Sequence, residues 1–353
     1  MAALSSQSVG ETSSTSLEGI LLGAGNPLLD ISATVPKEFL QKYNVKENDA
    51  ILAGEEHMSV YTEMSEFNPQ FIAGGATQNS IRVAQWMMKV PGATSYFGCV
   101  GSDAYATQME EQAKADGVNV QYLVDDKQAT GTCAVLITGE HRSLIANLAA
   151  ANHFKPEHLE NAVCKTIIDN AKFYYMAGFF LTVSLESIMK IGAHAVEQKK
   201  TVIMNLSAPF IVQFFWDQLN AALPFTDVMF GNESEAEAFG EKMEWGKDIE
   251  TIAKNIAAMP KASGFRSRTV IITQGRDPTI VVQNGVVYNF PVDLLAPEQI
   301  VDTNGAGDAF AGGYLSELAK GSSLEKCVHA GNWAARVIIQ QSGCCYPAVC
   351  EYE

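Results

Sequence analysis

The strongest constraint on the fold is an alternation of strand-like and helix-like segments between residues 173 and 273. Short apolar runs that are typical of buried strands occur at 173–177, 201–205, 227–230 and 269–273. Segments of helical periodicity lie between them at 184–198, 210–220, 233–240 and 248–258. Such an alternation builds right-handed βαβ units on a mainly parallel sheet. We therefore predict an α/β fold whose ligands bind beyond the carboxyl ends of the strands.

The N-terminal third adds a different pattern. Strands are predicted at 19–25 and 95–100, and helices at 76–89 and from Asp103 to Gly117. Three segments at 119–124, 131–138 and 142–148 then alternate with period two, which predicts an antiparallel β patch with hairpin-like links. Asn284-Gly285 predicts a further hairpin. We expect a flexible tail at 1–18 and a single domain at 19–353, with a small β lid formed from about 28–72 and 118–149.

Charge and cysteine content exclude several classes of function. Acidic residues outnumber basic ones 40 to 24, a formal net charge of −16, which disfavours nucleic acid and anionic membranes as partners. No apolar stretch reaches the roughly 18 residues of a spanning helix. The N-terminus lacks a secretory pattern, and the seven cysteines suit a reducing compartment. We expect a monomer in the cytoplasm, with the nucleus as the alternative compartment.

Two common nucleotide-binding patterns are ruled out. Gly23-Ala-Gly25 follows a strand, but Leu28 occupies the third glycine position of a dinucleotide fingerprint, and Pro27 would interrupt the helix. The Gly-Lys-Ser/Thr ending of a P-loop does not occur.

The segment Asp302 to Phe310 contains the strongest candidate chemistry. A predicted strand at 299–302 leads into Asn304-Gly305-Ala306-Gly307-Asp308, and helical periodicity follows. A small-residue turn at a helix N-terminus presents backbone N–H groups to an anion. Asp308 falls in the first turn, where the helix dipole favours its ionised form and a low pKa. This arrangement suits phosphoryl transfer to an alcohol, with Asp308 as proton acceptor; the alternative is an acidic cap on a packed helix.

Polar groups follow two other predicted strands near the N-terminus. Asn26 and Asp30 flank the start of a strand, and Asp30 can accept hydrogen bonds from sugar hydroxyls, or simply cap a turn. Gly74-Gly75 precedes a helix that carries Asn79, so this junction offers amides to a substrate, or is an ordinary left-handed turn.

Three further candidates come from the second half of the chain and the β patch. Asn232 and Glu235 form a capping-box pattern, and the same pair could lie near Mg²⁺ through water. Arg276 follows a strand and could hold a nucleotide phosphate, although a lone arginine is usually just solvated. Arg142 could reach the transferred phosphate if the patch is a lid.

Residues 302–310 resemble the signature of the ribokinase-like (phosphofructokinase-B type) kinases of carbohydrates and nucleosides. Five other segments resemble the members of that family that phosphorylate adenosine, namely 25–33, 75–86, 142–152, 177–184 and 205–210. The likeness covers residues 19–347. It implies a three-layer α/β/α domain with a mainly parallel sheet and a small β-sheet lid. It also implies transfer of the γ-phosphoryl group of ATP, with Mg²⁺, to the 5′-hydroxyl of adenosine, giving AMP and ADP in purine salvage.

The resemblance assigns roles to named residues. Asp308 is the base, Gly305, Ala306 and Gly307 form the anion hole, and Arg142 meets the phosphate. The substrate would be bound by Asn26, Asp30, Gly74, Gly75, Asn79 and Asn304, between apolar walls of Leu28, Leu52, Cys133, Leu144, Ala146, Leu148, Phe180 and Phe210. ATP would lie against Thr273, Gly275, Arg276 and Asn332, with Mg²⁺ near Asn232 and Glu235.

The chain departs from the family pattern at two positions. Ala76 stands where a serine is common, and Asn332 stands where a histidine can lie against the ATP base. Two alternatives stay open: a related kinase of a free sugar such as ribose, and a catalytically inactive nucleoside-binding paralogue.

Overall fold

A computed structural model describes residues 16–47, 49–139 and 141–353. Most of the predicted tail at 1–18 therefore lies outside the described residues. The strands are β1 (Leu21–Ala24), β2 (Leu28–Thr34), β3 (Ala50–Leu52), β4 (Gln70–Gly74), β5 (Thr94–Gly101), β6 (Asn119–Asp125), β7 (Thr132–Thr138), β8 (His141–Asn147), β9 (Phe173–Ala177), β10 (Thr201–Asn205), β11 (Val228–Asn232), β12 (Thr269–Gln274), β13 (Asp277–Gln283) and β14 (Val286–Phe290).

Helices connect most of these strands. The α-helices are α1 (Lys37–Lys42), α2 (Val60–Glu63), α3 (Ala76–Met88), α4 (Ala104–Ala115), α5 (Ala162–Asn170), α6 (Leu185–Glu197), α7 (Pro209–Phe214), α8 (Trp216–Ala222), α9 (Glu233–Lys242), α10 (Ile249–Ala258), α11 (Ala306–Ala319) and α12 (Leu324–Ile338). Short 3₁₀ turns are η1 (Glu55–His57), η2 (Met64–Phe67), η3 (Ala149–His153), η4 (Pro156–Glu160), η5 (Gly178–Thr182), η6 (Leu223–Phe225) and η7 (Pro297–Gln299).

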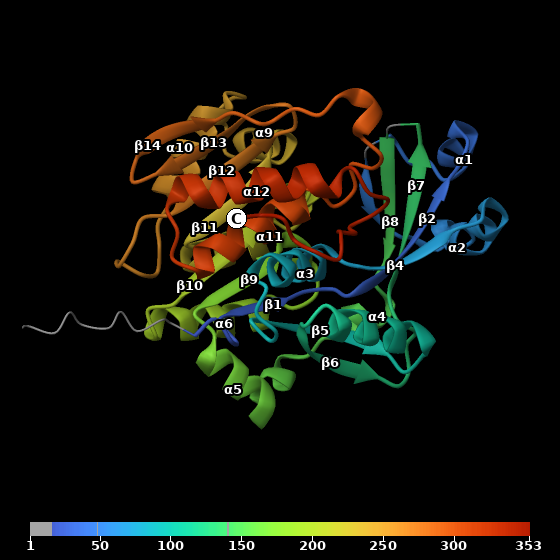
Figure 1. Cartoon of the computed structure of the whole chain (residues 1–353), viewed down its shortest axis with the longest axis horizontal. Helices are drawn as coiled ribbons and strands as arrows, with labels where there is room; N and C mark the ends of the chain where they lie inside the picture. The colour runs from blue at the N-terminus through green and yellow to red at the C-terminus, as the bar shows by residue number, and fades with distance from the viewer. Residues whose placement is uncertain (1–15, 48, 140) are drawn as a thin grey trace, which may run out of the picture.

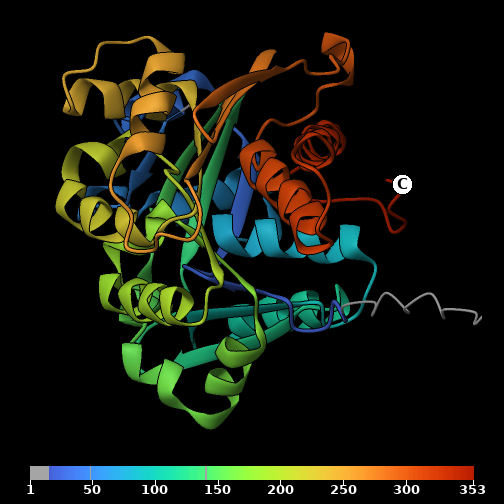
Figure 2. The same cartoon turned by 90° about the vertical axis from the view of Figure 1, so that its left-hand side faces the viewer.

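The large sheet has nine strands in the order β14-β13-β12-β11-β10-β9-β1-β5-β6. From β12 to β6 every neighbouring pair is parallel, whereas β13 and β14 continue as an antiparallel hairpin through Asn284-Gly285. Helices α3, α4, α11 and α12 cover one face, and α5 to α10 cover the other (Figure 2). The predicted three-layer α/β architecture is confirmed.

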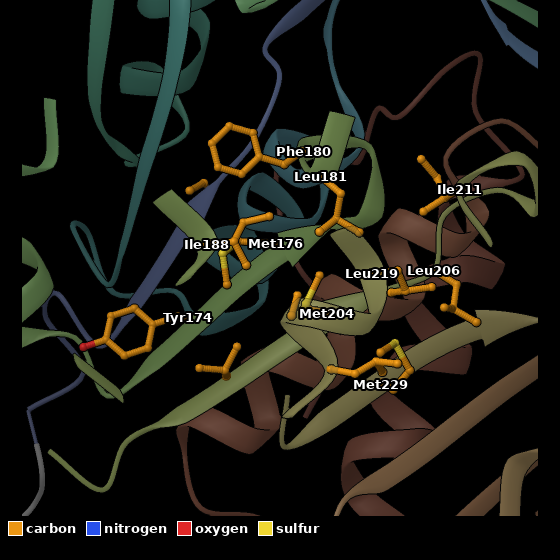
Figure 3. Close-up of a cluster of buried hydrophobic side chains, with 14 of the residues drawn as sticks. Tyr174, Met176, Phe180, Leu181, Ile188, Met204, Leu206, Ile211, Leu219 and Met229 are labelled. Atoms are coloured by element: carbon orange, nitrogen blue, oxygen red, sulfur yellow. The ribbon is translucent and has the colours of Figure 1, made fainter. Parts of the chain in front are cut away.

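Alternate residues of the central strands face opposite layers, as the pleat of a strand requires. Tyr174, Met176 and Met204 pack toward α6 and α8 in the cluster of Figure 3. Tyr175 and Ile203 pack on the other face with Phe310 of α11. Because both faces are buried, the strands are apolar throughout, and this is why they read as continuous apolar runs.

A second, five-stranded sheet has the order β3-β8-β7-β2-β4 and stands beside the large one (Figure 1). Strands β7 and β8 form the expected antiparallel hairpin, while β2 pairs parallel with β7. The prediction that 119–124 belongs to this sheet is wrong. Residues 119–125 form β6, which pairs parallel with β5 at the edge of the large sheet. An edge strand is half exposed, so it shows the same period-two pattern as an antiparallel strand.

Two other expectations are corrected. The predicted strand at 299–302 does not form, because the amides of Val301 and Asp302 both donate to the carbonyl of Ile339 instead of to a ladder. The predicted helix at 210–220 is two helices, α7 and α8, which are separated at Phe215.

Candidate active site

Four parallel strands of the large sheet end at one edge and carry polar residues there. Asn26 follows β1, Asn205 ends β10, Asn232 ends β11, and Thr273 lies near the end of β12. Together with the facing side of the small sheet they enclose a cavity of about 400 Å³. This volume is within the range of small-molecule sites, which is roughly 300–1,000 Å³.

Most of the residues singled out from the sequence line this cavity. They are Asn26, Leu28, Asp30, Leu52, Gly75, Asn79, Cys133, Arg142, Leu144, Ala146, Leu148, Phe180, Phe210, Asn232, Glu235, Thr273, Asn304, Gly305, Ala306, Gly307 and Asp308. Apolar lining residues come mainly from the small sheet and η5, and polar ones from the strand ends and α11.

Helix α11 begins at the predicted small-residue turn. Gly305 is its N-cap with φ of 76°, a left-handed conformation that glycine adopts without strain. The first amides of a helix have no intrahelical acceptor, and Gly305, Ala306 and Gly307 all line the cavity. Among them, Ala306 N–H donates to the carbonyl of Thr303 at 3.3 Å. A turn of this kind can present backbone amides to an anion, and Asp308 lies in the first turn of α11.

The ionisation of Asp308 differs from the prediction. The Asp308 carboxylate accepts a hydrogen bond from Asn79 Nδ2 at 3.0 Å. Desolvation nevertheless raises the pKa of Asp308 to about 7, and the Asn79 hydrogen bond offsets this only partly. The expected low pKa is therefore wrong, because burial outweighs the favourable position in the first turn. A carboxylate with a pKa near neutrality is well matched to proton transfer at physiological pH.

Asp30 is a second acidic group in the same cavity. Its pKa is raised to about 8 by burial first, and then by the negative charges of Asp308 and Asp302. Gly74 makes room for this carboxylate, since a Cβ at position 74 would lie 2.3 Å from Cγ of Asp30. The carboxylate is thus fixed between β2 and β4, where hydroxyl donors from a ligand would stabilise its ionised form.

Two asparagines present unsatisfied acceptors. Asn26 Nδ2 donates to the carbonyl of Phe179 at 3.1 Å, and Asn79 Nδ2 donates to Asp308. The Oδ1 atoms of both asparagines are buried and have no hydrogen-bond partner within the described part of the chain. Because an unpaired buried acceptor is costly, these atoms call for hydroxyl donors from a ligand.

Asn232 and Glu235 form the predicted capping box at the start of α9. Asn232 Oδ1 accepts from the Glu235 amide at 2.9 Å, and Glu235 Oε2 accepts from the Asn232 amide at 3.0 Å. Both residues also line the cavity, and burial raises the pKa of Glu235 to about 7. Among the described residues no group of three His, Cys, Asp or Glu side chains could hold a metal by itself. Hard oxygen donors and uncompensated acidity still fit Mg²⁺ held mainly by water and phosphate oxygens.

Arg142 lines the cavity but is engaged by the protein. Its Nε donates to Asp302 Oδ1 at 2.7 Å, and its Nη2 donates to the Val301 carbonyl at 2.7 Å. Its contact with a phosphate stays a prediction.

Four predicted site residues do not line the cavity. Gly74 lies behind Asp30, and Gly275 and Arg276 form the exposed turn between β12 and β13. Asn332 lies on α12, where its Oδ1 accepts from Thr279 Oγ1 at 3.3 Å. Their roles at an ATP site stay predictions.

Several residues without a predicted role also line the cavity. Asn205 ends β10 and Ser207 follows it, and Ser207 has φ of 69°, which is uncommon for a residue with a side chain. Thr77 Oγ1 accepts from the Ala177 amide at 3.0 Å and so joins α3 to β9. A usable signal existed for Asn205 and Ser207, since Asn205 ends a predicted strand and Ser207 follows it, at the edge where ligands bind. Others that line the cavity are Ala50, Ile51, Ala76, Ala177, Phe179, Thr182, Phe230, Gly231, Thr303 and Phe310.

Comparison with known proteins identifies the class. Residues 37–349 match the model of the pfkB family carbohydrate kinases, and the chain belongs to this family. It is 54% identical over 337 residues to adenosine kinase 2 of Arabidopsis thaliana, which covers 95% of this chain and 98% of the relative. It is 44% identical to adenosine kinase of Dictyostelium discoideum over 328 residues, or 93% and 96% of the two chains.

Solved structures agree with this assignment. The crystal structure of Anopheles gambiae adenosine kinase in complex with P1,P4-di(adenosine-5) tetraphosphate superposes with a TM-score of 0.91 at 50% identity, covering 94% of this chain and 99% of that one. Adenosine kinase from Schistosoma mansoni in complex with 2-fluoroadenosine gives a TM-score of 0.91 at 35% identity, with coverage of 94% and 98%.

Proposed function

We propose that the protein is an adenosine kinase, which transfers the γ-phosphoryl group of ATP to the 5′-hydroxyl of adenosine and gives AMP and ADP. The observation that carries this proposal is one cavity with Asp30 among apolar walls and Asp308 at the start of α11. A ribose diol suits Asp30, a flat base suits the apolar walls, and a reacting hydroxyl suits Asp308. The full-length identity to adenosine kinases supports the same substrate.

In the proposed mechanism, the 5′-oxygen bonds to the γ-phosphorus as the bond from that phosphorus to the β–γ bridging oxygen breaks. The hydroxyl proton passes to Asp308, and ADP carries the leaving oxygen. The amides of Gly305, Ala306 and Gly307 would stabilise the phosphoryl oxygens, since preorganised donors act most strongly where charge develops. Asn79 would hold Asp308 in place through the hydrogen bond described above.

Asp30 and Asn26 would bind the ribose hydroxyls, with Gly75 and Asn79 alongside. The base would lie between Leu28, Leu144 and Phe210, with the other predicted apolar residues around it. Mg²⁺, held near Asn232 and Glu235 through water, would supply charge neutralisation for the phosphates.

The small sheet is proposed to act as a lid. Strands β2, β3, β7 and β8 carry one wall of the cavity, and Gly75, with φ of 94°, lies where β4 leaves the sheet. A sheet that carries binding residues and is joined by such a turn can close over substrate.

The chain is proposed to act as a cytoplasmic monomer without nucleic-acid or membrane partners. Within the described residues, no helix is both long and apolar enough to cross a bilayer. Sedimentation of the purified protein tests the oligomeric state.

A coupled ADP-release assay with adenosine, inosine and ribose tests the function. We expect adenosine to give the highest kcat/KM. A preference for ribose would establish the sugar-kinase alternative instead, and binding without turnover would establish an inactive paralogue.

A further inference from the structure

Asp302 is a buried carboxylate that the proposed mechanism does not use. Its side chain is 1% exposed, and it immediately precedes residues 303–307, which lead into α11. We call these residues the anion-binding turn, after their role in the proposed mechanism. Oδ1 accepts from Arg142 Nε at 2.7 Å and from the Asn304 amide at 2.8 Å, while Oδ2 accepts from the Gly343 amide at 2.9 Å. One carboxylate thus joins the small sheet, the anion-binding turn and residues 342–344, which we call the C-terminal segment.

Arg142 links this carboxylate to the wall of the cavity. It lies on β8, and every second residue from it along the chain, namely Leu144, Ala146 and Leu148, lines the same cavity. Side chains two apart on a strand share a face, so the strand that would contact the nucleoside base also carries the cation that binds Asp302. Arg142 Nη2 adds a hydrogen bond to the Val301 carbonyl at 2.7 Å.

The C-terminal segment completes the arrangement from the other side. Ser342 Oγ donates to Gln70 Oε1 of β4 at 3.1 Å. A Cβ on Gly343 would lie 2.7 Å from Cδ1 of Ile72, and one on Gly305 would lie 3.0 Å from Cβ of Cys344. This segment is therefore packed closely between the small sheet and the anion-binding turn.

The geometry leaves little freedom at this junction. Charge-assisted hydrogen bonds in a buried setting are short and directional, and removal of either partner leaves an uncompensated buried charge. Among the described contacts, the Arg142–Asp302 ion pair and the hydrogen bond from Arg142 to Val301 link the residues just before this turn to β8, and the hydrogen bond from the Gly343 amide to Asp302 links them to the C-terminal segment.

We propose that Asp302 is a positioning residue, which sets the anion-binding turn at the start of α11 in register with the nucleoside-binding face of β8 through Arg142. This inference rests on the proposed function, because the turn matters only if it receives the transferred phosphoryl group. It concerns a residue that touches no reacting atom and acts through the amide of Asn304.

The test begins with Asp302→Asn, which keeps the shape and removes the charge. Displacement of catalytic groups by about 1 Å can cost on the order of 10²-fold in rate. We expect kcat to fall by about 10- to 100-fold, adenosine affinity to change by less than about threefold, and amide exchange at Asn304 and Gly343 to accelerate in the ligand-free protein.

Asp103→Asn is the matched control. The Asp103 carboxylate also accepts three hydrogen bonds, from the Ala106 amide and from the amide and hydroxyl of Thr130, and it does not line the cavity. The Asp103→Asn substitution should lower the melting temperature and leave kcat unchanged. If Asp302→Asn behaves in the same way, with only a lower melting temperature, Asp302 is merely structural and the proposal is overturned.

Coupling through Arg142 is tested with Arg142→Lys, which keeps the positive charge and loses the planar fork. Faster exchange at the Asn304 amide is expected in this variant, although Arg142 does not contact that amide. The fold reduction in kcat of the double variant should be no more than about twice that of Asp302→Asn alone, because both substitutions break the same ion pair. Losses that multiply, or unchanged exchange at Asn304 in Arg142→Lys, would show that Arg142 acts independently. The exchange experiment needs no substrate, so it stands even if wild-type protein fails to phosphorylate adenosine.

Discussion

Asn79 Nδ2 donates a hydrogen bond to Asp308 Oδ2 at 3.0 Å, and this contact joins α3 to the first turn of α11. The hydrogen bond lowers the pKa of Asp308 against the larger effect of burial, and the pKa lies at about 7. Residues of both α3 and α11 thus determine the pKa of the proposed base.

The first prediction concerns the pH dependence of this contact. Because the ionised carboxylate is the active base, kcat/KM of the wild type should rise with pH through about 7. Asn79→Ala removes the hydrogen bond that favours the ionised form. The rising limb should therefore move to higher pH, and activity at pH 7 should fall.

Asn161→Ala is the control for that experiment. Asn161 caps α5, away from the cavity, through a hydrogen bond from the Cys164 amide at 2.8 Å. Its loss should cost about 1 kcal/mol of stability and leave the pH profile in place. An unshifted limb in Asn79→Ala would remove this residue from control of Asp308.

The second prediction is that ionised Asp30 lowers the stability of the ligand-free protein and strengthens adenosine binding. The folded-state pKa of about 8 lies above the ordinary value, so folding favours the neutral acid. Its contribution to stability is present below the ordinary pKa near 4 and is lost as the pH rises toward 8. Asp30→Asn should therefore raise the melting temperature of the ligand-free protein more at pH 8 than at pH 5. Adenosine binding, measured by calorimetry, should weaken at least about tenfold.

An Asp30→Asn protein that is destabilised equally at both pH values would contradict the proposed burial penalty. Unchanged adenosine affinity would exclude Asp30 as a ligand of the ribose.

The third prediction tests the close approach between Gly74 and Asp30. A Cβ at position 74 would lie 2.3 Å from Cγ of Asp30, so Gly74→Ala must displace the carboxylate. The KM for adenosine should rise by about tenfold or more with little change in the KM for ATP. Gly264→Ala is the control, since a Cβ there meets nothing within 4 Å and its φ is not in the left-handed range.

The fourth prediction concerns the small sheet. If it closes over the cavity, adenosine should slow amide exchange in β7 and β8, which carry Cys133 and Leu144 into the lining. Strand β6 pairs in the large sheet and should show much less change. Equal protection of β7 and β8 with and without adenosine would argue against closure.

Much of the fold follows from periodicity alone. The strands of the large sheet were predictable from apolar runs, because a sheet covered on both faces needs apolar residues at every position. The same criterion fails at 119–125, because β6 lies at the edge of the large sheet and many of its side chains are partly exposed. Residues 299–302 have strand-forming side chains, but the amides of Val301 and Asp302 donate to the carbonyl of Ile339. A local sequence pattern does not indicate this contact.

The site was predictable where chemistry is concentrated in a short segment. The small residues at 305–307, followed by helical periodicity, predicted a glycine turn at a helix N-terminus, and α11 begins there. The raised pKa of Asp308 was not predictable, since the desolvation and the Asn79 hydrogen bond that set it depend on residues far away in the sequence. The Arg142–Asp302 pair joins residues 160 positions apart, so only the folded structure shows it.

The central claim is that Asp308 accepts a proton from adenosine that is bound in this cavity. The most direct measurement compares wild type with Asp308→Asn, with adenosine affinity by calorimetry and AMP formation by single turnover on the same samples. We expect adenosine affinity within about threefold of wild type and a phosphoryl-transfer rate lower by roughly 10²–10⁴. AMP formation at the wild-type rate in Asp308→Asn would contradict this claim.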